Sequence, residues 1–167
     1  MWNNNQYILK EGWGKSLIND QVHQNFLANH QRLKIIEEFD HVAGHHPVVD
    51  HLINQKENII SLAKKLLVDV YDFEHSIQVY DNNQGLPLHN DFYDDNRDRA
   101  VSGIIWLNPI AVEGTLVYNK QEKLIGQLGG NPGDLLLFLT TEQSHHSALN
   151  TTDIPRYTIN LTFANKI

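Results

Sequence analysis

The spacing of apolar residues changes along the chain, and this change divides it near residue 71. In the first part, apolar positions recur every three or four residues, which is the spacing of one helix face. A first helix is expected to begin at Asp20, a suitable N-cap, and its apolar face includes Val22, Phe26, Leu27 and Leu33.

A second helix is predicted before residue 71 by a clearer signal. Asn54 and Glu57 have the spacing of a capping box, in which two side chains satisfy free N–H groups at a helix start. An apolar stripe at helical spacing follows them, formed by Ile59, Leu62, Ala63, Leu66, Leu67 and Val70. Residues 1–71 are therefore expected to be mostly helical, and the apolar stripe needs a sheet to cover.

After residue 71 the chain changes to short runs typical of β-strands. These runs are rich in β-branched and aromatic residues and are separated by clusters of Asn, Asp, Gly and Pro. Strands are predicted at residues 76–80, 101–107, 115–119, 123–127, 135–139 and 157–163. This order predicts a mainly β fold, a sandwich or jelly roll backed by the two helices. Residues 1–167 are expected to form one domain, with helical support in 1–71 and the β core in 72–167.

The last predicted strand alternates strictly between polar and apolar residues. From Arg156 to Phe163 every second residue is apolar, so Arg156, Thr158 and Asn160 share one face. A solvent-facing side of a sheet would give the same pattern. The surroundings of this strand in the fold therefore decide between a plain surface and a binding site.

Composition limits the chemistry that this chain can perform. Its 41% apolar and 20% charged residues are ordinary for a soluble globular protein. There is no cysteine, which excludes disulfides, thiolate nucleophiles and cysteine zinc sites, so any metal must be bound by His, Asp or Glu. The formal net charge of −7 comes without a Lys/Arg stripe, so a nucleic-acid partner is not expected.

The same survey of the sequence predicts a cytoplasmic protein without a membrane partner. No apolar run approaches the roughly 18 residues of a membrane span. The first five residues, Met1-Trp2-Asn3-Asn4-Asn5, also lack the basic and apolar regions of a signal peptide.

A candidate metal site begins with His89 and Asp91. In an extended segment residues i and i+2 point the same way, so this imidazole and this carboxylate can reach one ion. Alone the pair is a weak signal, because ten histidines produce such pairs by chance. A second imidazole, from His145 or His146, would complete a facial triad of two histidines and one carboxylate. We favour His146, and the donor set suits Fe(II).

Arg156 follows His146 by ten residues and opens the alternating strand. A guanidinium is permanently charged and binds a carboxylate through two hydrogen bonds. It could therefore hold the far end of a dicarboxylate that chelates the metal. A surface ion pair at the edge of a sheet is the alternative interpretation of this residue.

An ordered set of motifs over residues 76–163 resembles the prolyl-hydroxylase-like branch of the iron(II)- and 2-oxoglutarate-dependent oxygenases. The set comprises Gln78-Val79-Tyr80, His89-x-Asp91, Ser102-Gly103-Ile104-Ile105-Trp106-Leu107-Asn108, Glu113-Gly114-Thr115-Leu116, Pro132-Gly133-Asp134-Leu135, His146-Ser147-Ala148 and Arg156-Tyr157-Thr158-Ile159. The resemblance implies a double-stranded β-helix in which the catalytic metal ligands are His89, Asp91 and His146.

The resemblance also implies the cofactors and the reaction. Fe(II), 2-oxoglutarate and O2 are expected, with ascorbate as an accessory reductant. Arg156 would bind the cosubstrate, with Tyr80, Asn160 and Trp106 beside it. The implied reaction is hydroxylation of an amino-acid residue, with proline as the first candidate, in a protein or peptide, and the co-products are succinate and CO2.

At three positions this chain differs from members of the family that it resembles or of a related branch. Many of them carry a tyrosine where Trp106 stands, and their usual paired glycine is here Gly114-Thr115. The nucleic-acid repair branch carries a second arginine where this chain has Thr162. The first two differences concern the cosubstrate end of the site, and the third agrees with the acidic charge in excluding that branch.

Other interpretations remain open at this point. The same chemistry could act on a free amino acid or small metabolite, and residues 92–99, directly after the ligands, are the candidate substrate loop. A cupin-type metalloenzyme that does not use 2-oxoglutarate is a second alternative, because His146-x-x-x-Asn150 resembles one of the cupin motifs. A third alternative is a non-catalytic jelly-roll binding module, which would need no metal. A further group of possible metal ligands is interpreted as part of a polar loop in preference to a metal site. It comprises His41, His45, His46, Asp50 and His51.

Overall fold

The computed structural model describes residues 5–10, 14–19, 56–64, 66, 69–92, 99–108, 110–119, 121–131, 134–142 and 144–164. These residues form ten strands and one helix. The elements are β1 (Asn5–Lys10), β2 (Gly14–Asn19), α3 (Lys56–Lys64), β3 (Asp72–Tyr80), β4 (Gly85–His89), β5 (Arg99–Trp106), β6 (Thr115–Tyr118), β7 (Leu124–Leu128), β8 (Leu135–Leu139), β9 (His146–Leu149) and β10 (Arg156–Ala164).

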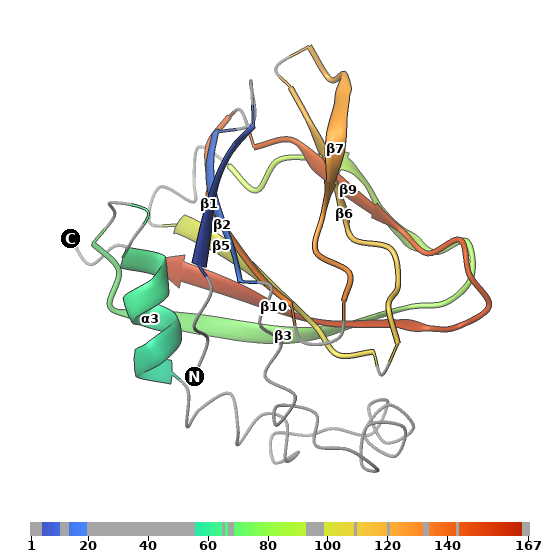
Figure 1. Cartoon of the computed structure of the whole chain (residues 1–167), viewed down its shortest axis with the longest axis horizontal. Helices are drawn as coiled ribbons and strands as arrows, with labels where there is room; N and C mark the ends of the chain where they lie inside the picture. Colours follow the sequence, from blue (N-terminus) through green and yellow to red (C-terminus); the bar gives the residue numbers. More distant parts are fainter. Residues whose placement is uncertain are drawn as a thin grey trace.

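The strands form two antiparallel sheets that face each other (Figure 1). The six-stranded sheet has the order β1-β2-β8-β5-β10-β3, and the four-stranded sheet has the order β4-β9-β6-β7. Strands that are neighbours in space are often distant in sequence, as in a jelly roll, and α3 packs on the outer face of the six-stranded sheet. The predicted mainly β jelly roll with helical backing is confirmed.

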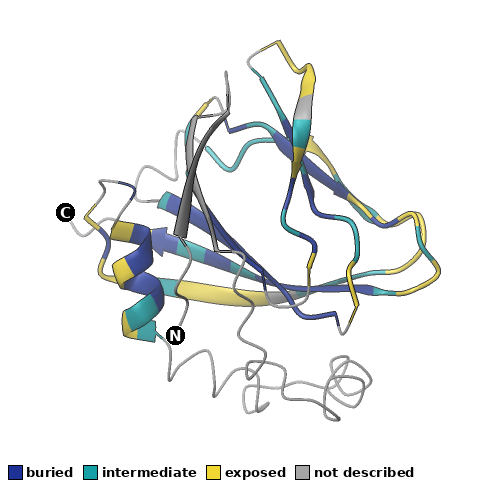
Figure 2. Ribbon diagram, viewed as in Figure 1, coloured by how far each residue is buried: buried dark blue, intermediate teal, exposed yellow. Residues whose placement is uncertain are grey.

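Apolar side chains fill both faces of the six-stranded sheet. The outer cluster lies between this sheet and α3, and Figure 2 shows buried residues along one side of that helix. Its buried members are Ile59, Ile60, Leu62, Ala63, Leu66, Val70, Val101, Ile105, Leu107, Leu135, Leu137, Tyr157, Ile159, Leu161 and Phe163. The inner cluster lies between the sheets and consists of Ile104, Trp106, Val117, Leu128, Leu136 and Phe138.

Strand β8 shows why these two clusters can share one sheet. Leu135 and Leu137 point to the outer cluster, whereas Leu136 and Phe138 point to the inner one. A strand that is buried on both faces reads as a continuous apolar run and does not alternate. The uninterrupted run at residues 135–139 is therefore the signature of a central strand.

Strand β10 has one apolar face and one polar face. Its apolar residues Tyr157, Ile159, Leu161 and Phe163 belong to the outer cluster. The polar residues between them, beginning with Arg156, point toward the four-stranded sheet. The alternation predicted for this strand is confirmed, and its polar face is interior.

The predictions for the first 71 residues were only partly right. Helix α3 contains the first half of the predicted apolar stripe and ends at Lys64, so Leu66 and Val70 of that stripe are buried beyond the helix. The first predicted helix and the histidine loop at residues 41–51 lie outside the described residues. Two strands, β1 and β2, occupy a region that was predicted to be mostly helical. They form a hairpin, and β2 pairs with β8, so a partner more than 100 residues away stabilises them.

Two strands of the β core were not predicted. Strand β4 contains Gly85 and Pro87, which lower β propensity, and it lies at the edge of its sheet, where proline is tolerated. Strand β9 has only four residues. The other strands lie within a few residues of their predicted positions. No helix among the described residues is long and apolar enough to cross a membrane.

We expect Leu137→Ala to lower the free energy of unfolding by about 2–5 kcal/mol, because Leu137 is fully buried in the outer cluster. The matched control is Leu149→Ala, since Leu149 is 45% exposed and its truncation should change stability by less than about 0.5 kcal/mol. Urea denaturation of both variants checks this difference. Equal losses in the two variants would contradict the described core.

Candidate functional site

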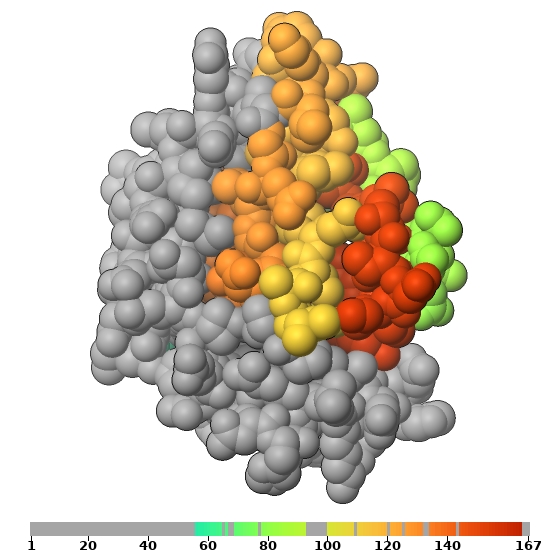
Figure 3. Space-filling model, turned by 45° about the vertical axis from the view of Figure 1, so that its right-hand side comes forward, coloured from blue at the N-terminus to red at the C-terminus, as the bar shows by residue number. Residues whose placement is uncertain are grey.

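A cavity of about 200 Å³ lies between the two sheets. Its lining comes from β3, β5, β8 and β10 of the six-stranded sheet and from β4, β6 and β9 of the four-stranded sheet. Figure 3 shows residues 110–131, in yellow and orange, beside the red chain that follows residue 144 on one face of the molecule. The cavity is thus built from segments that are far apart in sequence.

Three side chains in this cavity can reach a single ion. His89, Asp91 and His146 each offer one ligand atom, and these atoms lie within 4.8 Å of one another. The distance from His89 Nε2 to Asp91 Oδ1 is 3.5 Å, and that from His146 Nε2 to Asp91 Oδ2 is 3.8 Å. His89 and His146 face each other directly, because β4 and β9 pair at these two residues.

Hydrogen bonds prepare both imidazoles for metal binding. The Nδ1 atom of His89 lies 2.7 Å from the carbonyl oxygen of Pro87, and that of His146 lies 2.7 Å from the carbonyl oxygen of Ser144. A carbonyl only accepts, so Nδ1 carries the hydrogen in each ring. In a neutral imidazole the lone pair then resides on Nε2, the atom that faces the other ligands.

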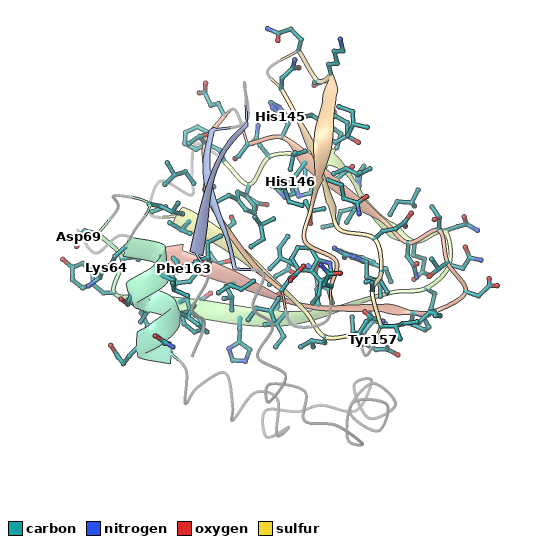
Figure 4. The ribbon with its side chains drawn as sticks, viewed as in Figure 1. Lys64, Asp69, His145, His146, Tyr157 and Phe163 are labelled. Carbon is teal, nitrogen blue, oxygen red and sulfur yellow. The ribbon has the colours of Figure 1, made fainter. Side chains whose placement is uncertain are left out.

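The structure distinguishes the two adjacent histidines at residues 145 and 146. His146 is the first residue of β9 and His145 directly precedes it (Figure 4), and consecutive side chains of an extended segment point to opposite sides. His146 is 6% exposed, lines the cavity and packs edge-on against Phe138. His145 instead places Nε2 3.3 Å from Asn90 Nδ2 and does not line the cavity. The geometry therefore brings the predicted His146 to Asp91.

Arg156 brings a buried positive charge to the same cavity. It is 2% exposed, and its Nε donates a hydrogen bond to the carbonyl oxygen of Glu113 at 3.2 Å. Its guanidinium lies 5.7 Å from the Tyr80 ring and 5.8 Å from the Trp106 ring. Among the described residues, no carboxylate forms an ion pair with it. Such a charge is costly to bury and is suited to an anionic ligand.

Burial also changes the proton affinity of this guanidinium. Desolvation lowers the pKa of Arg156 from its ordinary value to about 10, whereas Tyr80 and the carboxylate of Glu113 act in the opposite direction. Arg156 is therefore still charged at neutral pH. Desolvation likewise raises the pKa of Tyr80, and the charge of Arg156 partly offsets this increase.

A buried asparagine fixes the chain on both sides of Arg156. Asn108 Nδ2 donates to the carbonyl oxygen of Pro155 at 2.7 Å, and Asn108 Oδ1 accepts from the amide of Tyr157 at 2.9 Å. Because Asn108 is fully buried, these bonds are shielded from water. The direction in which β10 enters the sheet, and with it the position of Arg156, is held firmly.

Asn150, which echoed a cupin motif in the sequence, has a structural role here. Its Nδ2 donates to the carbonyl oxygens of Tyr80 and Ile154, both at 2.8 Å. It does not line the cavity. It joins the end of β3 to the loop before β10, away from His89, Asp91 and His146.

Of the remaining predicted site residues, two line the cavity and one does not. Tyr80 and Asn160 line the cavity, and the hydroxyl of Tyr80 donates to Gln78 Oε1 at 2.7 Å. Trp106 is fully buried beside Arg156 but does not line the cavity, and its Nε1 has no hydrogen-bond partner among the described residues. The space for its ring depends on Gly129, whose Cβ, if present, would lie 2.2 Å from the indole.

Several polar residues of the cavity were missed by the sequence interpretation. Thr115 is 1% exposed, lines the cavity, and its Oγ1 has no partner among the described residues. Ser102 lines it too and donates to Asp91 Oδ2 at 2.8 Å. Polar residues at every second position of a strand were the available signal, as in Ser76 and Gln78 before Tyr80.

The residues present fit a divalent metal and a dicarboxylate. Two imidazoles and one carboxylate, without thiolate, form the donor set of non-haem Fe(II) sites, which leave coordination positions open. At the other end, a carboxylate would receive hydrogen bonds from the guanidinium of Arg156, which forms no ion pair with a described carboxylate. It would also receive one from the hydroxyl of Thr115, which has no hydrogen-bond partner in the described part of the chain.

Comparison with solved structures shows the same fold in several hydroxylases. The prolyl-4-hydroxylase of Pseudomonas putida matches with a TM-score of 0.64 and 15% identity, over 86% of this chain and 84% of that one. The viral collagen prolyl hydroxylase of Paramecium Bursaria Chlorella virus-1, in a 2OG complex, matches with a TM-score of 0.60 and 19% identity, over 84% and 93%.

A third solved structure is the prolyl hydroxylase of Trichoplax adhaerens in complex with a hypoxia inducible factor oxygen degradation domain peptide fragment. It matches with a TM-score of 0.51 and 18% identity, over 65% of this chain and 55% of that one. At identities this low, the likeness to all three structures concerns the fold alone.

Sequence comparison identifies the family. No curated protein matches the chain. The family model described as the 2OG-Fe(II) oxygenase superfamily matches residues 75–164, which include all three candidate metal ligands and Arg156. Because this match covers more than half of the 167 residues, the protein belongs to the 2OG-Fe(II) oxygenase superfamily, and its jelly-roll fold is similar to that of the prolyl-4-hydroxylase of Pseudomonas putida.

Proposed function

We propose that this 2-oxoglutarate-dependent oxygenase hydroxylates an amino-acid residue, with proline as the first candidate, in a protein or peptide. His89, Asp91 and His146 would hold Fe(II), and Arg156 would hold the distal carboxylate of 2-oxoglutarate. One observation carries this proposal: three ligand atoms converge within 4.8 Å in a cavity that also contains a buried guanidinium with no ion-pair partner among the described residues.

When bound, the metal and cosubstrate would supply oxidation of a substrate C–H bond to C–OH by O2, with conversion of 2-oxoglutarate to succinate and CO2. The protein's part is to bind, to orient and to exclude water. Nε2 of each imidazole presents its lone pair, since Nδ1 donates to the backbone. Leu86, Ile104 and Phe138 supply apolar surface to the cavity wall.

A peptide substrate is favoured over a free metabolite by the neighbouring folds. Two solved structures of this fold are prolyl-4-hydroxylase or collagen prolyl hydroxylase, and a third holds a peptide fragment. Residues 92–99 follow Asp91 directly and are proposed to contact the substrate; of these, residues 93–98 lie outside the described part of the chain.

Each of the substitutions His89→Ala, Asp91→Ala and His146→Ala is expected to lower uncoupled turnover by more than about 100-fold, because loss of a ligand should exceed the 10–100-fold cost of losing an outer partner. The measurement is succinate formation from 2-oxoglutarate with Fe(II) and O2. His145→Ala is the matched control and should retain turnover, since His145 does not line the cavity. Equal activity in all four variants would refute the proposed metal site.

Arg156→Met is expected to keep or raise the stability of the ligand-free protein, by up to about 4 kcal/mol, while abolishing stabilisation by 2-oxoglutarate. The folded-state pKa of Arg156, about 10, is below the ordinary pKa of a guanidinium. The unfolded state therefore binds more protons between these values, so stability rises with pH in that window, and the cost of burial is fully present at pH 7.

Urea denaturation and melting curves with Mn(II), with and without 2-oxoglutarate, separate the two effects. The wild type should gain about 2.7 kcal/mol at a 2-oxoglutarate concentration of about 100 Kd. Arg156→Lys is the charge-conserving control and should recover part of this gain, because an ammonium cannot make the paired contacts of a guanidinium. An undiminished gain in Arg156→Met would exclude Arg156 as the cosubstrate anchor.

A further inference from the structure

Two buried hydroxyls from the six-stranded sheet, those of Ser102 and Thr140, connect by hydrogen bonds to the carboxylate of Asp91. Ser102 Oγ on β5 donates to Asp91 Oδ2 at 2.8 Å, and Thr140 Oγ1 lies 3.0 Å from Ser102 Oγ. Ser102 is 2% exposed and Thr140 is 7% exposed. The two are diagonal neighbours, because β5 and β8 pair and the amide of Thr140 donates to the carbonyl oxygen of Ala100.

The hydrogen bonds of these two hydroxyls are directed from Thr140 to Ser102 and from Ser102 to Asp91. An ionised carboxylate only accepts, so the single hydroxyl hydrogen of Ser102 is directed to Asp91. Ser102 must then be the acceptor in its contact with Thr140, and Thr140 is the donor. Each hydroxyl thereby polarises the next, and the bond that reaches Asp91 is charge-assisted.

The hydrogen bond from Ser102 matters because Asp91 is not itself part of a strand. His89 and His146 are held by strand pairing within the four-stranded sheet. Asp91 instead lies in a bend after β4 has ended, and Ser102 connects its carboxylate to the six-stranded sheet. The distance between the carboxylate and the two imidazoles therefore depends on a bond that spans the cavity between the sheets.

We propose that Ser102, supported by Thr140, is a positioning residue that holds the Asp91 carboxylate toward His89 and His146 and so sets the affinity for the metal. This inference rests on the proposed function, because it presupposes that Asp91 is a ligand. Its physical basis is that a ligand held in place before binding loses less freedom when the ion arrives.

The experiment uses the full chain and Co(II) alone as the probe, with two readouts: the dissociation constant by titration and the d–d absorption spectrum. Ser102→Ala should raise the dissociation constant about 10–100-fold and change the spectrum. Ser102→Thr keeps the hydroxyl and should restore both. Thr140→Val should have a smaller effect in the same direction, and it decides the question if Ser102→Ala does not fold.

Ser147→Ala is the matched control for a merely structural effect. Ser147 is a buried serine whose Oγ lies 2.9 Å from Tyr118 Oη, and it follows His146 directly but does not line the cavity. Its truncation should lower stability without changing the dissociation constant or the spectrum. If Ser147→Ala weakens Co(II) binding as much as Ser102→Ala does, the positioning role is refuted.

Asp91→Ala separates this inference from the function on which it rests. If Asp91→Ala greatly weakens Co(II) binding while Ser102→Ala and Thr140→Val bind as the wild type does, the inference about Ser102 fails and the metal site stands. If Asp91→Ala itself binds Co(II) with wild-type affinity and spectrum, the proposed metal site fails.

Discussion

Strand β10 pairs with β3 on one side and with β5 on the other. This pairing puts the outer hydrophobic cluster on one face of the sheet and the cavity on the other. Along β10, alternate residues enter the outer cluster or face the cavity, and the register aligns Arg156 with Tyr80 and Thr158 with Trp106. The register that buries Ile159 in the outer cluster therefore also directs Arg156 into the cavity. Stability and ligand binding depend on one strand in one register.

The cavity and its immediate surroundings contain groups that a protein would not bury for stability alone. The guanidinium of Arg156 is buried and forms no ion pair with a described carboxylate. The hydroxyl of Thr115 and the indole N–H of Trp106 are buried without described partners. Proteins tolerate such costs at functional sites, where a ligand supplies the missing interactions. The family assignment identifies the expected ligand as 2-oxoglutarate beside Fe(II).

Sequence patterns predicted those parts of the molecule in which local and global preferences agree. The apolar run of β8 and the alternation of β10 appear as predicted, and α3 forms over the first half of its predicted stripe. Strand β4 was missed because its glycine and proline argue locally against a strand, and β1 and β2 were missed because pairing with β8 stabilises them. Non-local pairing outweighed local propensity at these three strands.

The sequence by itself determined the chemistry available to the site: no thiolate, a His-x-Asp spacing that directs two donors the same way, and a polar face that starts with Arg156. Only the tertiary structure decided that His146 and not His145 faces Asp91, and that Ser102 lies against its carboxylate. The physical reason is register. Neighbouring residues of a strand point to opposite faces, so which of them enters a cavity depends on pairing with strands far away in the sequence.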